Sequence, residues 1–485
     1  MEQPKVCIIH NPTAQYPTEN FNPSVYYPEY PFGEEEINSA ENKVYEMVRE
    51  SLCRLGLDSE HYGTKEWNPL KDYVKPGQKV LIKPNLVMHE NENKKVYENA
   101  MECLVTHPSC IRAICDYCVI ALGNAGGTIL IADAPMQGCD FDALIKKMHI
   151  DSLLDFYKQK GLDVRLKDLR QYQSVFNSQR VITEKRFTDS HGIIVSLGGK
   201  SAHIGSPSNQ QYQVSDYEKK DTQHFHHDSV HDYELSADIL QADCIINFCK
   251  PKTHRLAGFT AAMKNMVGAT YNKASLPHRS AGSVKEGGDA YQQKNVLKRL
   301  ADFALTQKIR AENKHNIVFA TFLRYVYGIS LVTARKFGKD TFYIGSWYGN
   351  DTIWRTVCDL NYAVTYADKN GKLCDTPQRK MLNFGDMVIS GERNGPVSPQ
   401  PKKMGVIIAS DNSAAFDMTL CKMMHFDFDK IPMCRNLKSG STNIPFTDPC
   451  VIFTDGETVN EDILSKISFP AEWRFVPHDA WKDVL

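Results

Sequence analysis

The sequence predicts an α/β fold, with mostly parallel or mixed sheets, flanking helices and two lobes around a cleft. Short apolar runs of strand length recur along the 485 residues, and segments with helical spacing separate them. Buried strands that alternate with helices are typical of a parallel sheet. The length allows two or three units of domain size. We predict an N-terminal lobe at 1–200, a polar insertion or cleft cover at 201–240 and a C-terminal lobe at 241–485.

The first elements follow a strand and helix order. Residues 6–10 form a short apolar run that predicts a strand. In residues 38–55, apolar residues recur at helical spacing, Asn38 can cap the start and Gly56 can end the helix. Residues 80–82 predict a second buried strand. The segment "THPSCIRAICDYCVIALGNAGG" then predicts a helix, and "TILIADAPMQG" predicts a third strand.

The second half repeats this order after a polar stretch. Residues 206–232 lack a sustained apolar period, which predicts a long loop or cover. "DYELSADILQADCIINF" returns to helix and strand, and residues 282–289 read as a flexible loop. Further strands are predicted in "DMVISGERNGPVSP", "MGVIIASDNSAAFDMTLCKMM" and "CVIFTDGE", the second of them followed by a helix.

Residues 317–334, "IVFATFLRYVYGISLVTA", are about as long as a membrane-spanning helix. Arg324 near the middle counts against a span, because a charge at the bilayer centre costs roughly 3 kcal/mol or more. We therefore predict a core helix and no transmembrane segment, and keep peripheral membrane contact through 317–334 as the second interpretation.

Charge and cysteine content narrow the class of protein. Lys plus Arg (57) and Asp plus Glu (58) nearly cancel, so no global field attracts nucleic acid, and we expect no nucleic-acid partner. The first residues lack the pattern of a secretory signal. Fourteen cysteines spread through a large chain are typical of free thiols in a reducing compartment. We expect a cytoplasmic protein.

The segment "KPKTHRLAGFTAAMKNMVG" at 250–268 directly follows the apolar run "CIINFC". If the backbone is extended, Lys250, Lys252 and His254 point to one side. A helix that starts near Thr260 could bind an anion with its first amides, and Lys264 and Asn265 follow at once. This concentration of cations and amides predicts a site for phosphate, carboxylate or a sugar acid.

Three other predicted strand ends carry similar groups. In open α/β sheets, ligands bind at the carboxyl ends of the strands, so these groups predict one shared cleft. We assign catalytic roles to His254, Asp133 and Lys264. We expect the substrate to contact the remaining polar groups, which are Lys83, Asn85, Lys250, Lys252, Thr260, Asn265, Glu392 and Asn394. Asp133 could act as a general base or hold a divalent cation such as Mg²⁺. The sequence does not identify a metal.

Two other clusters could carry a cofactor. Cys110, Cys115 and Cys118 have the C-x₄-C-x₂-C spacing of a [2Fe–2S] ligand set. Their neighbours predict a helix, whereas such clusters sit in irregular loops, so we expect core thiols and no iron–sulfur cluster. The run "HFHHDSVHD" could recruit zinc if His227 and His231 shared a helix face with His224 and His226 nearby. No nucleotide-binding glycine motif occurs in the right context.

The first functional hypothesis is a cytoplasmic enzyme that acts on a small anionic metabolite, such as a phosphorylated or carboxylated sugar or precursor, by proton transfer, hydrolysis or group transfer. The second is an iron–sulfur redox protein. The third is a non-catalytic metabolite-binding protein.

Several of these segments together resemble a known family, the domain of unknown function 362 proteins. The resembling stretches are "VKPGQKVLIKPNLV", "VTHP", "ILIADAP", "ADCIINFCKPKTHRLAGFTAAMKNMVG" and "ISGERNGPVSP", and they span about residues 74–430. Residues 345–361 look like a feature of a large-chain branch, which adds Asn350, Asp351, Trp354 and Arg355 as cleft candidates. Some relatives carry a ferredoxin-like module, but its cysteine run is missing from this sequence. The resemblance implies an α/β fold and no particular reaction.

Overall fold

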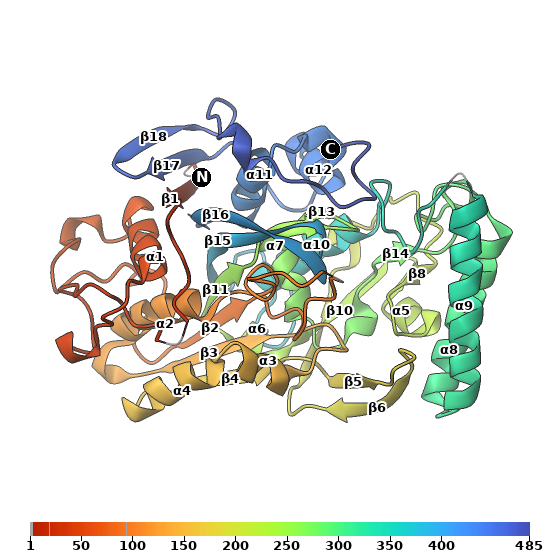
Figure 1. Cartoon of the computed structure of the whole chain (residues 1–485), viewed down its shortest axis with the longest axis horizontal. Helices are drawn as coiled ribbons and strands as arrows, with labels where there is room; N and C mark the ends of the chain where they lie inside the picture. The colour runs from red at the N-terminus through yellow and green to blue at the C-terminus, as the bar shows by residue number, and fades with distance from the viewer. Residues whose placement is uncertain (1–2, 19, 94, 339) are drawn as a thin grey trace.

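A computed structural model describes residues 3–18, 20–93, 95–338 and 340–485. Its centre is a mixed sheet of eleven strands with helices on both faces (Figure 1). This architecture confirms the predicted α/β class. Along the main path, the order of the strands is β18-β17-β1-β16-β15-β11-β2-β3-β4, and β12 and β13 extend it beside β15.

One half of the sheet is entirely parallel. β11 lies between β15 and β2, and β2 is followed by β3 and β4. Every residue of β11 is buried because helices cover both faces, which explains the unbroken apolar run that marked it in the sequence. The bounds of these strands are Lys380–Asn394 for β15, Cys244–Cys249 for β11, Lys79–Pro84 for β2, Thr128–Asp133 for β3 and Val164–Asp168 for β4.

The other half of the sheet joins the two ends of the chain. β1 (Lys5–His10) pairs antiparallel with β16 (Ser398–Ser410) and parallel with β17 (Cys450–Asp455), and β18 (Thr458–Ile463) forms the edge. Strands from the predicted lobes 1–200 and 241–485 therefore share one sheet. The division into these lobes stays a prediction, since strand pairing by itself does not define domains.

Alternate residues of the strands support two sets of helices. Val80 and Ile82 pack with α1 (Lys43–Arg54), α2 (Pro108–Leu122) and α4 (Ile150–Gln159). Leu81 and Ile245 face the opposite layer. That layer contains α6 (Ala237–Gln241), α10 (Ile353–Tyr366), α11 (Ser413–Met423) and α12 (Pro432–Ser439). α3 (Phe141–Lys147) packs its apolar side in a smaller cluster at the sheet edge.

Small elements surround the main sheet. β12 (Lys252–His254), β13 (Gly258–Thr260) and α7 (Ala262–Asn265) come from the 250–268 motif. Three further pairings use short strands. They are β7 (Gly192–Ser196) with β10 (Val230–Ser236) and β9 (His226–His227), β8 (Tyr212–Gln213) with β14 (Arg279–Ser280), and β5 (Tyr172–Phe176) with β6 (Ile182–Phe187).

Two local expectations need correction. α1 begins at Lys43 because the side chain of Asn42 caps it by accepting from the amide of Tyr45, whereas Asn38 accepts from Ala40 in a separate turn. The stretch 206–232 is not a continuous loop. It contains α5 (Lys219–Phe225) and the short strands β8 and β9, whose hydrogen bonds organise an otherwise polar segment.

A helical hairpin, α8 (Val296–Asn313) and α9 (Ile317–Phe337), forms the end of the molecule opposite β17 and β18 (Figure 1). The prediction that α9 is a core helix is wrong. One side of α9 packs through Ala320, Leu323 and Leu331, but large apolar side chains on the other side are exposed. Hydrophobicity alone could not distinguish these cases, because a long apolar helix reads the same whichever way it faces.

Candidate functional site

The 250–268 motif folds over the carboxyl ends of the parallel strands. β11 ends at Cys249, Pro251 interrupts the strand, and β12 then pairs with β13 and, at Lys252, with β15. The turn encloses a cavity of about 140 Å³. The predicted residues that line it are Asn85, Asp133, Lys252, His254, Thr260, Lys264 and Asn265. Its other charged or titratable lining residues are Arg255, Lys273 and His278.

Asp133 and Lys83 form a buried ion pair at one wall of this cavity. Lys83 Nζ lies 2.6 Å from Asp133 Oδ1, which also accepts from the amide of Ala134, and Oδ2 accepts from the amide of Leu86 at 2.7 Å. Three donors therefore hold the Asp133 carboxylate. This geometry favours a positioning role for Asp133 over the predicted role as a general base or cation ligand. Lys83 is likewise occupied by Asp133 and does not line the cavity.

Gly268 allows the motif to approach this pair. A Cβ atom at Gly268 would collide with Asp133 Oδ1 and lie 2.6 Å from Lys83 Nζ. The amide of Ala134 and the carbonyl of Gly268 are hydrogen-bonded at 2.9 Å, which ties the motif to the end of β3. The glycine that ends "KNMVG" is thus required by close packing.

A row of asparagines fixes the floor of the cavity. Asn85 Nδ2 donates to Asn265 Oδ1 at 3.0 Å, and Asn265 Nδ2 donates to Asn247 Oδ1 at 2.8 Å. Asn247 in turn donates to Asn383, its register partner across β11 and β15. Because these amides satisfy one another, Asn85 and Asn265 shape the cavity more than they offer free groups to a ligand.

Among the residues that the structure describes, the lysines that line the cavity have no carboxylate partner in bonding distance. Lys252 Nζ donates to Asn85 Oδ1 at 2.9 Å and to the carbonyl of Leu104, and Lys273 Nζ donates to the carbonyl of Ala134 at 2.8 Å. In the described part of the chain, Lys264 Nζ has no hydrogen-bond or ion-pair partner within bonding distance. The cavity therefore holds cationic groups whose charge the protein does not neutralise.

Burial and mutual repulsion shift the pKa values of these amines downward. Desolvation, followed by the field of Arg255 and Lys273, lowers the pKa of Lys264 to about 7. Desolvation and the nearby Lys250 lower the pKa of Lys252 to about 7, and burial lowers the pKa of Lys273 to about 8 although Asp133 opposes the shift. Amines with such pKa values can exchange a proton near neutral pH.

His254 and His278 present different ring atoms. His254 Nδ1 accepts from the amides of Leu256 at 3.0 Å and Ala257 at 3.2 Å, so the neutral ring carries its proton on Nε2. Burial, followed by the charge of Lys264, holds the pKa of His254 well below its ordinary value. His254 is therefore suited to donate a hydrogen bond through Nε2, and its predicted catalytic role stays a prediction. His278 Nδ1 donates to the carbonyl of Leu276 at 2.8 Å, which leaves the Nε2 lone pair free.

The predicted anion site at the start of the helix is occupied by the protein itself. α7 has only four residues, and the amide of Met263 donates to Asp417 Oδ1 at 3.2 Å. Burial raises the pKa of Asp417 to about 8, against the hydrogen bonds that favour its charged form. The remaining donor from this stretch is the hydroxyl of Thr260, which is buried and has no partner in the described residues.

Lys250 belongs to a different cluster. Its Nζ lies 3.0 Å from Asp386 Oδ2 and 2.9 Å from the hydroxyl of Tyr16, which also bonds Asp386. The ring of Tyr16 stacks on His107 at 4.0 Å between centroids. The expected grouping of Lys250 with Lys252 and His254 is corrected here, because Pro251 breaks the strand and each lysine finds its own partners.

Glu392 and Asn394 also lie apart from the cavity. Glu392 Oε2 accepts from the amide of Val476 at 2.9 Å, and Asn394 Nδ2 donates to Asp479 at 3.2 Å. β15 continues through both residues and carries them away from the cavity, to the C-terminal segment. Pro396 is the residue of this stretch that reaches the cavity wall.

The large-branch candidates have local roles. Asp351 Oδ2 lies 2.9 Å from Arg355 Nη2, and Asp351 Oδ1 accepts from the indole of Trp354 at 2.8 Å. Asn350 Oδ1 accepts from the amide of Ile353 at the start of α10, and its Nδ2 donates to the carbonyl of His278. Asn350 thus supports the cavity wall indirectly, through the backbone of His278.

The cysteine group lies on a helix, as its neighbours predicted, and the histidine group lies on two short strands. Cys110, Cys115 and Cys118 are buried thiols on α2, where a regular helix points them in different directions. His226 and His231 lie on β9 and β10, with their Nδ1 atoms 3.3 Å apart, whereas His227 is exposed. The helical face that would have grouped His227 with His231 is therefore absent.

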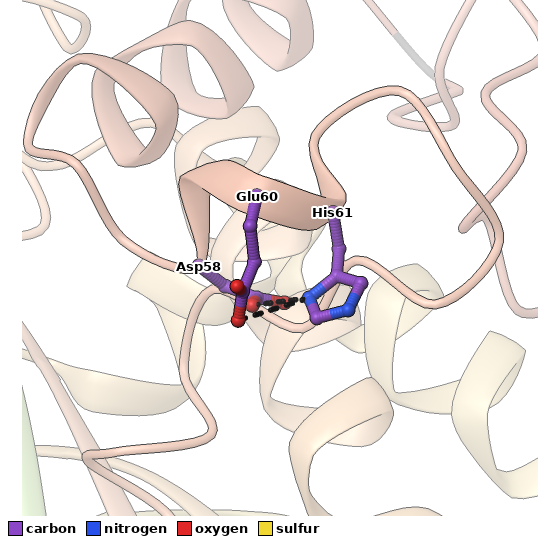
Figure 2. A group of neighbouring side chains, drawn as sticks. All are labelled: Asp58, Glu60 and His61. Atoms are coloured by element: carbon purple, nitrogen blue, oxygen red, sulfur yellow. Dashed lines mark hydrogen bonds and ion pairs between the residues drawn. The ribbon is translucent and has the colours of Figure 1, made fainter.

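Among the described residues, one group of three side chains has the spacing of metal ligands, namely Asp58, Glu60 and His61 (Figure 2). Asp58 Oδ1 lies 2.7 Å from His61 Nδ1 and also bonds Lys71. Burial would raise the pKa of Asp58, but the hydrogen bonds from Lys71, Asn68 and His61 outweigh it and lower this pKa to about 2. Lys71 already supplies the cation, so this surface group reads as a salt-bridge cluster.

The sequence did not indicate Arg255, Lys273 or His278 as site residues. Arg255 follows His254 directly, and its guanidinium Nε is buried without a hydrogen-bond partner among the described residues. Lys273 and His278 come from the "YNKASLPHRS" stretch, which has no strand or motif to mark it. The only sign in the sequence was the type of side chain, a cation and an imidazole. Both residues reach the cavity because the chain passes the ends of β2 and β3 again after the 250–268 motif.

Comparison with known proteins gives a family and little more. The model of the family described as "Domain of unknown function (DUF362)" matches residues 205–422, which include the 250–268 motif and most of the cavity lining. The resemblance noted for residues 74–204 lies outside this match. No curated protein matches the chain.

One solved structure that matches is the crystal structure of a protein from Thermotoga maritima, a target of the Northeast Structural Genomics Consortium. It is 10% identical, with a TM-score of 0.27, and the match covers 74% of this chain and 53% of that chain. The chain thus spans about half the length of that protein. This likeness is too distant to carry an argument about the site. The match over residues 205–422 supports an assignment to the domain of unknown function 362 family.

Proposed function

We propose that this protein is an enzyme that binds the anionic group of a small phosphorylated or carboxylated metabolite in the 140 Å³ cavity and transfers a proton with the amine of Lys264. The observation that carries the proposal is the unpartnered Lys264 amine among Lys252, Arg255 and Lys273. Burying uncompensated cations together is costly, and an anion would offset that cost. The volume suits one phosphate or carboxylate group, so the rest of a metabolite would extend outside the cavity.

The proposed roles follow from the free atoms of each side chain. Lys252, Arg255 and Lys273 neutralise the anion, and the Thr260 hydroxyl and His254 Nε2 donate hydrogen bonds to its oxygens. Lys264, with a pKa of about 7, is divided between its charged and neutral forms at neutral pH. Its neutral form can accept a proton from a carbon or hydroxyl next to the anionic group, and the ammonium that forms then pairs with the anion. An anion without such a proton would instead draw one from solvent. A pKa near the working pH is the optimum for a general base. Asp133 and the asparagines hold these groups in place.

A metal ion is part of the proposed site only if the substrate brings it. A divalent cation such as Mg²⁺ would have to bind with the substrate, because Lys83 and backbone amides already hold Asp133. The fourteen thiols of the chain are free, and a reducing, cytoplasmic location fits them. We include that location in the proposal.

The direct test is calorimetric titration of the whole chain with inorganic phosphate and with glycolate, followed by the Lys264→Met variant. We expect the variant to bind phosphate about 10- to 100-fold more weakly, the value of a charge-assisted hydrogen bond in a buried site. The matched control is Lys430→Met, which removes an exposed lysine far along the sequence at the end of a surface turn. Unchanged affinity in Lys264→Met would reject the assignment.

A second experiment separates an enzyme from a binding protein. Exchange of substrate-derived hydrogen with deuterium oxide, followed by NMR on a panel of small phosphorylated and carboxylated compounds, reports proton transfer without knowledge of the product. We expect exchange by the wild type and its loss in Lys264→Met. Tight binding without exchange of any compound would favour the metabolite-binding alternative.

A further inference from the structure

The exposed face of α9 is broad and apolar. The exposed side chains include Val318 (83%), Phe322 (60%), Ile329 (66%) and Val332 (65%). At 100° per residue, the exposed apolar positions of α9 cover an arc of roughly 140°, wider than the narrow seam of a coiled coil. The full set is Val318, Phe319, Phe322, Tyr325, Ile329, Val332 and Phe337. Soluble monomers rarely leave a continuous surface of this kind uncovered.

α9 is anchored by its opposite face. Ala320, Leu323, Leu331 and Ala334 are buried, and α8 runs beside α9 along the hairpin (Figure 1). Because α8 packs along α9, only one side of α9 is open to a membrane, which suits a helix lying in the membrane interface better than one that spans the bilayer. α8 adds exposed apolar groups of its own, with Val296 and Phe303 among them.

The hairpin region is more basic than the chain as a whole. The chain has a net charge of -1, yet residues 294–337 contain nine lysines and arginines and two acidic residues. α9 itself has Arg324, Arg335 and Lys336 and no acidic residue. The four cations of α8 pair with acidic residues, whereas the described ion pairs include none of the three cations of α9, so the cations open to a partner are mainly those of α9.

A groove on this face brings cations next to the apolar side chains. It has a volume of about 580 Å³, and its lining includes Arg180, Arg324, Tyr325, Ile329 and Val332. Arg180 comes from the turn between β5 and β6 and makes a long contact, 3.4 Å, with Glu92. Guanidinium groups beside aromatic and aliphatic side chains are suited to phosphate headgroups above an acyl boundary.

We propose that the α8–α9 hairpin docks the protein on an anionic membrane surface, with the exposed face of α9 at the boundary between headgroups and acyl chains. Charge complementarity decides between the possible occupants. A second copy of the chain would bring two basic hairpins together, whereas an anionic bilayer attracts each cation. In the described residues, α9 is also the one helix long and apolar enough to cross a membrane. Its anchored face and Arg324 favour a position in the interface.

The test is co-sedimentation of the full chain with vesicles. Vesicles of phosphatidylcholine with about one third phosphatidylserine should bind the protein at least about tenfold more tightly than phosphatidylcholine alone. The double variant Phe322→Asp with Ile329→Asp should lose binding altogether, because both side chains would carry charge into the interface. Both positions are exposed, so circular dichroism should remain unchanged. Arg335→Gln with Lys336→Gln should weaken binding about tenfold or more, at roughly fivefold per cation.

The matched control is Val459→Asp. Val459 is an exposed apolar residue on β18, at the end of the molecule opposite the hairpin, and its substitution should leave vesicle binding unchanged. Two results would overturn the proposal. One is absence of binding to the anionic vesicles, or equal binding by the Phe322→Asp, Ile329→Asp variant. The other is self-association in sedimentation velocity that this variant abolishes without any vesicle binding, which would identify a second copy as the occupant.

Discussion

Lys250 and Lys264 belong to one motif at the ends of the same sheet, the first fully buried and the second half-buried, yet the protein treats their charges in opposite ways. Lys250 is held by Asp386 and Tyr16, with distances of 3.0 and 2.9 Å from its Nζ. Lys264 lies among Lys252, Arg255 and Lys273, and its amine has no partner in the described chain. The first arrangement satisfies a charge for stability. The second leaves a charge unsatisfied, as a binding site for an anion does.

The largest expected effect breaks the satisfied cluster. Lys250→Met would leave Asp386 buried without its cation and should lower the free energy of unfolding by about 3–5 kcal/mol. Urea unfolding measures this loss. The double variant Lys250→Met with Asp386→Leu removes both charges and should recover much of it. If Lys250→Met is no less stable than Lys264→Met, the two regions do not differ as described.

A smaller effect is expected at the wall between the motif and β3. Gly268→Ala inserts a methyl group against Asp133 and Lys83, and should lower the free energy of unfolding by about 1–3 kcal/mol, the usual cost of overpacking. Thermal unfolding of this variant gives the result. Gly440→Ala, at an open position after α12, is a useful reference for the general cost of adding a methyl group at glycine, although its positive φ adds strain there. A stable Gly268→Ala variant would contradict the close packing of this wall.

The smallest effect, at most about 1.4 kcal/mol for each pH unit, concerns pH. The pKa of Lys264 is lower in the folded state, about 7, than in an unfolded chain, so between about pH 7 and 10 the unfolded state binds more protons. The burial penalty is complete below pH 7 and is relieved as the pH rises. The stability of the wild type relative to Lys264→Met should therefore increase with pH over this range. Urea unfolding of both proteins at several pH values measures this difference in the free energy of unfolding. A difference that does not change with pH would mean that the pKa of Lys264 is not lowered in the folded state.

The sequence predicted the parts of the site that depend on strand ends. The runs "LIKPNL", "IADAP" and "CIINFCK" placed Lys83, Asp133 and the 250–268 motif at one edge of a parallel sheet, because apolar runs and their polar exits are local patterns. The family resemblance was confirmed over residues 205–422.

The remaining features depend on long-range geometry. The sequence alternation placed Lys250 with Lys252, but Asp386, more than a hundred residues away, captured Lys250. His278 reaches the cavity from a segment without regular pattern, and the four-residue α7 meets a carboxylate of α11 that no local signal reveals. For α9, the apolar residues predicted a helix but not which of its faces the rest of the protein would bury.

The central claim is that the cavity holds amines that become protonated when an anion binds. Calorimetric titration with sulfate at pH 8, in two buffers of different ionisation enthalpy, measures this directly, because sulfate keeps its charge there and any protons must come to the protein. With pKa values of about 7 for Lys252 and Lys264, we expect about one proton or more to be taken up per sulfate bound, and the uptake to fall in Lys264→Met. Binding without proton uptake, or no binding of sulfate at all, would contradict the account.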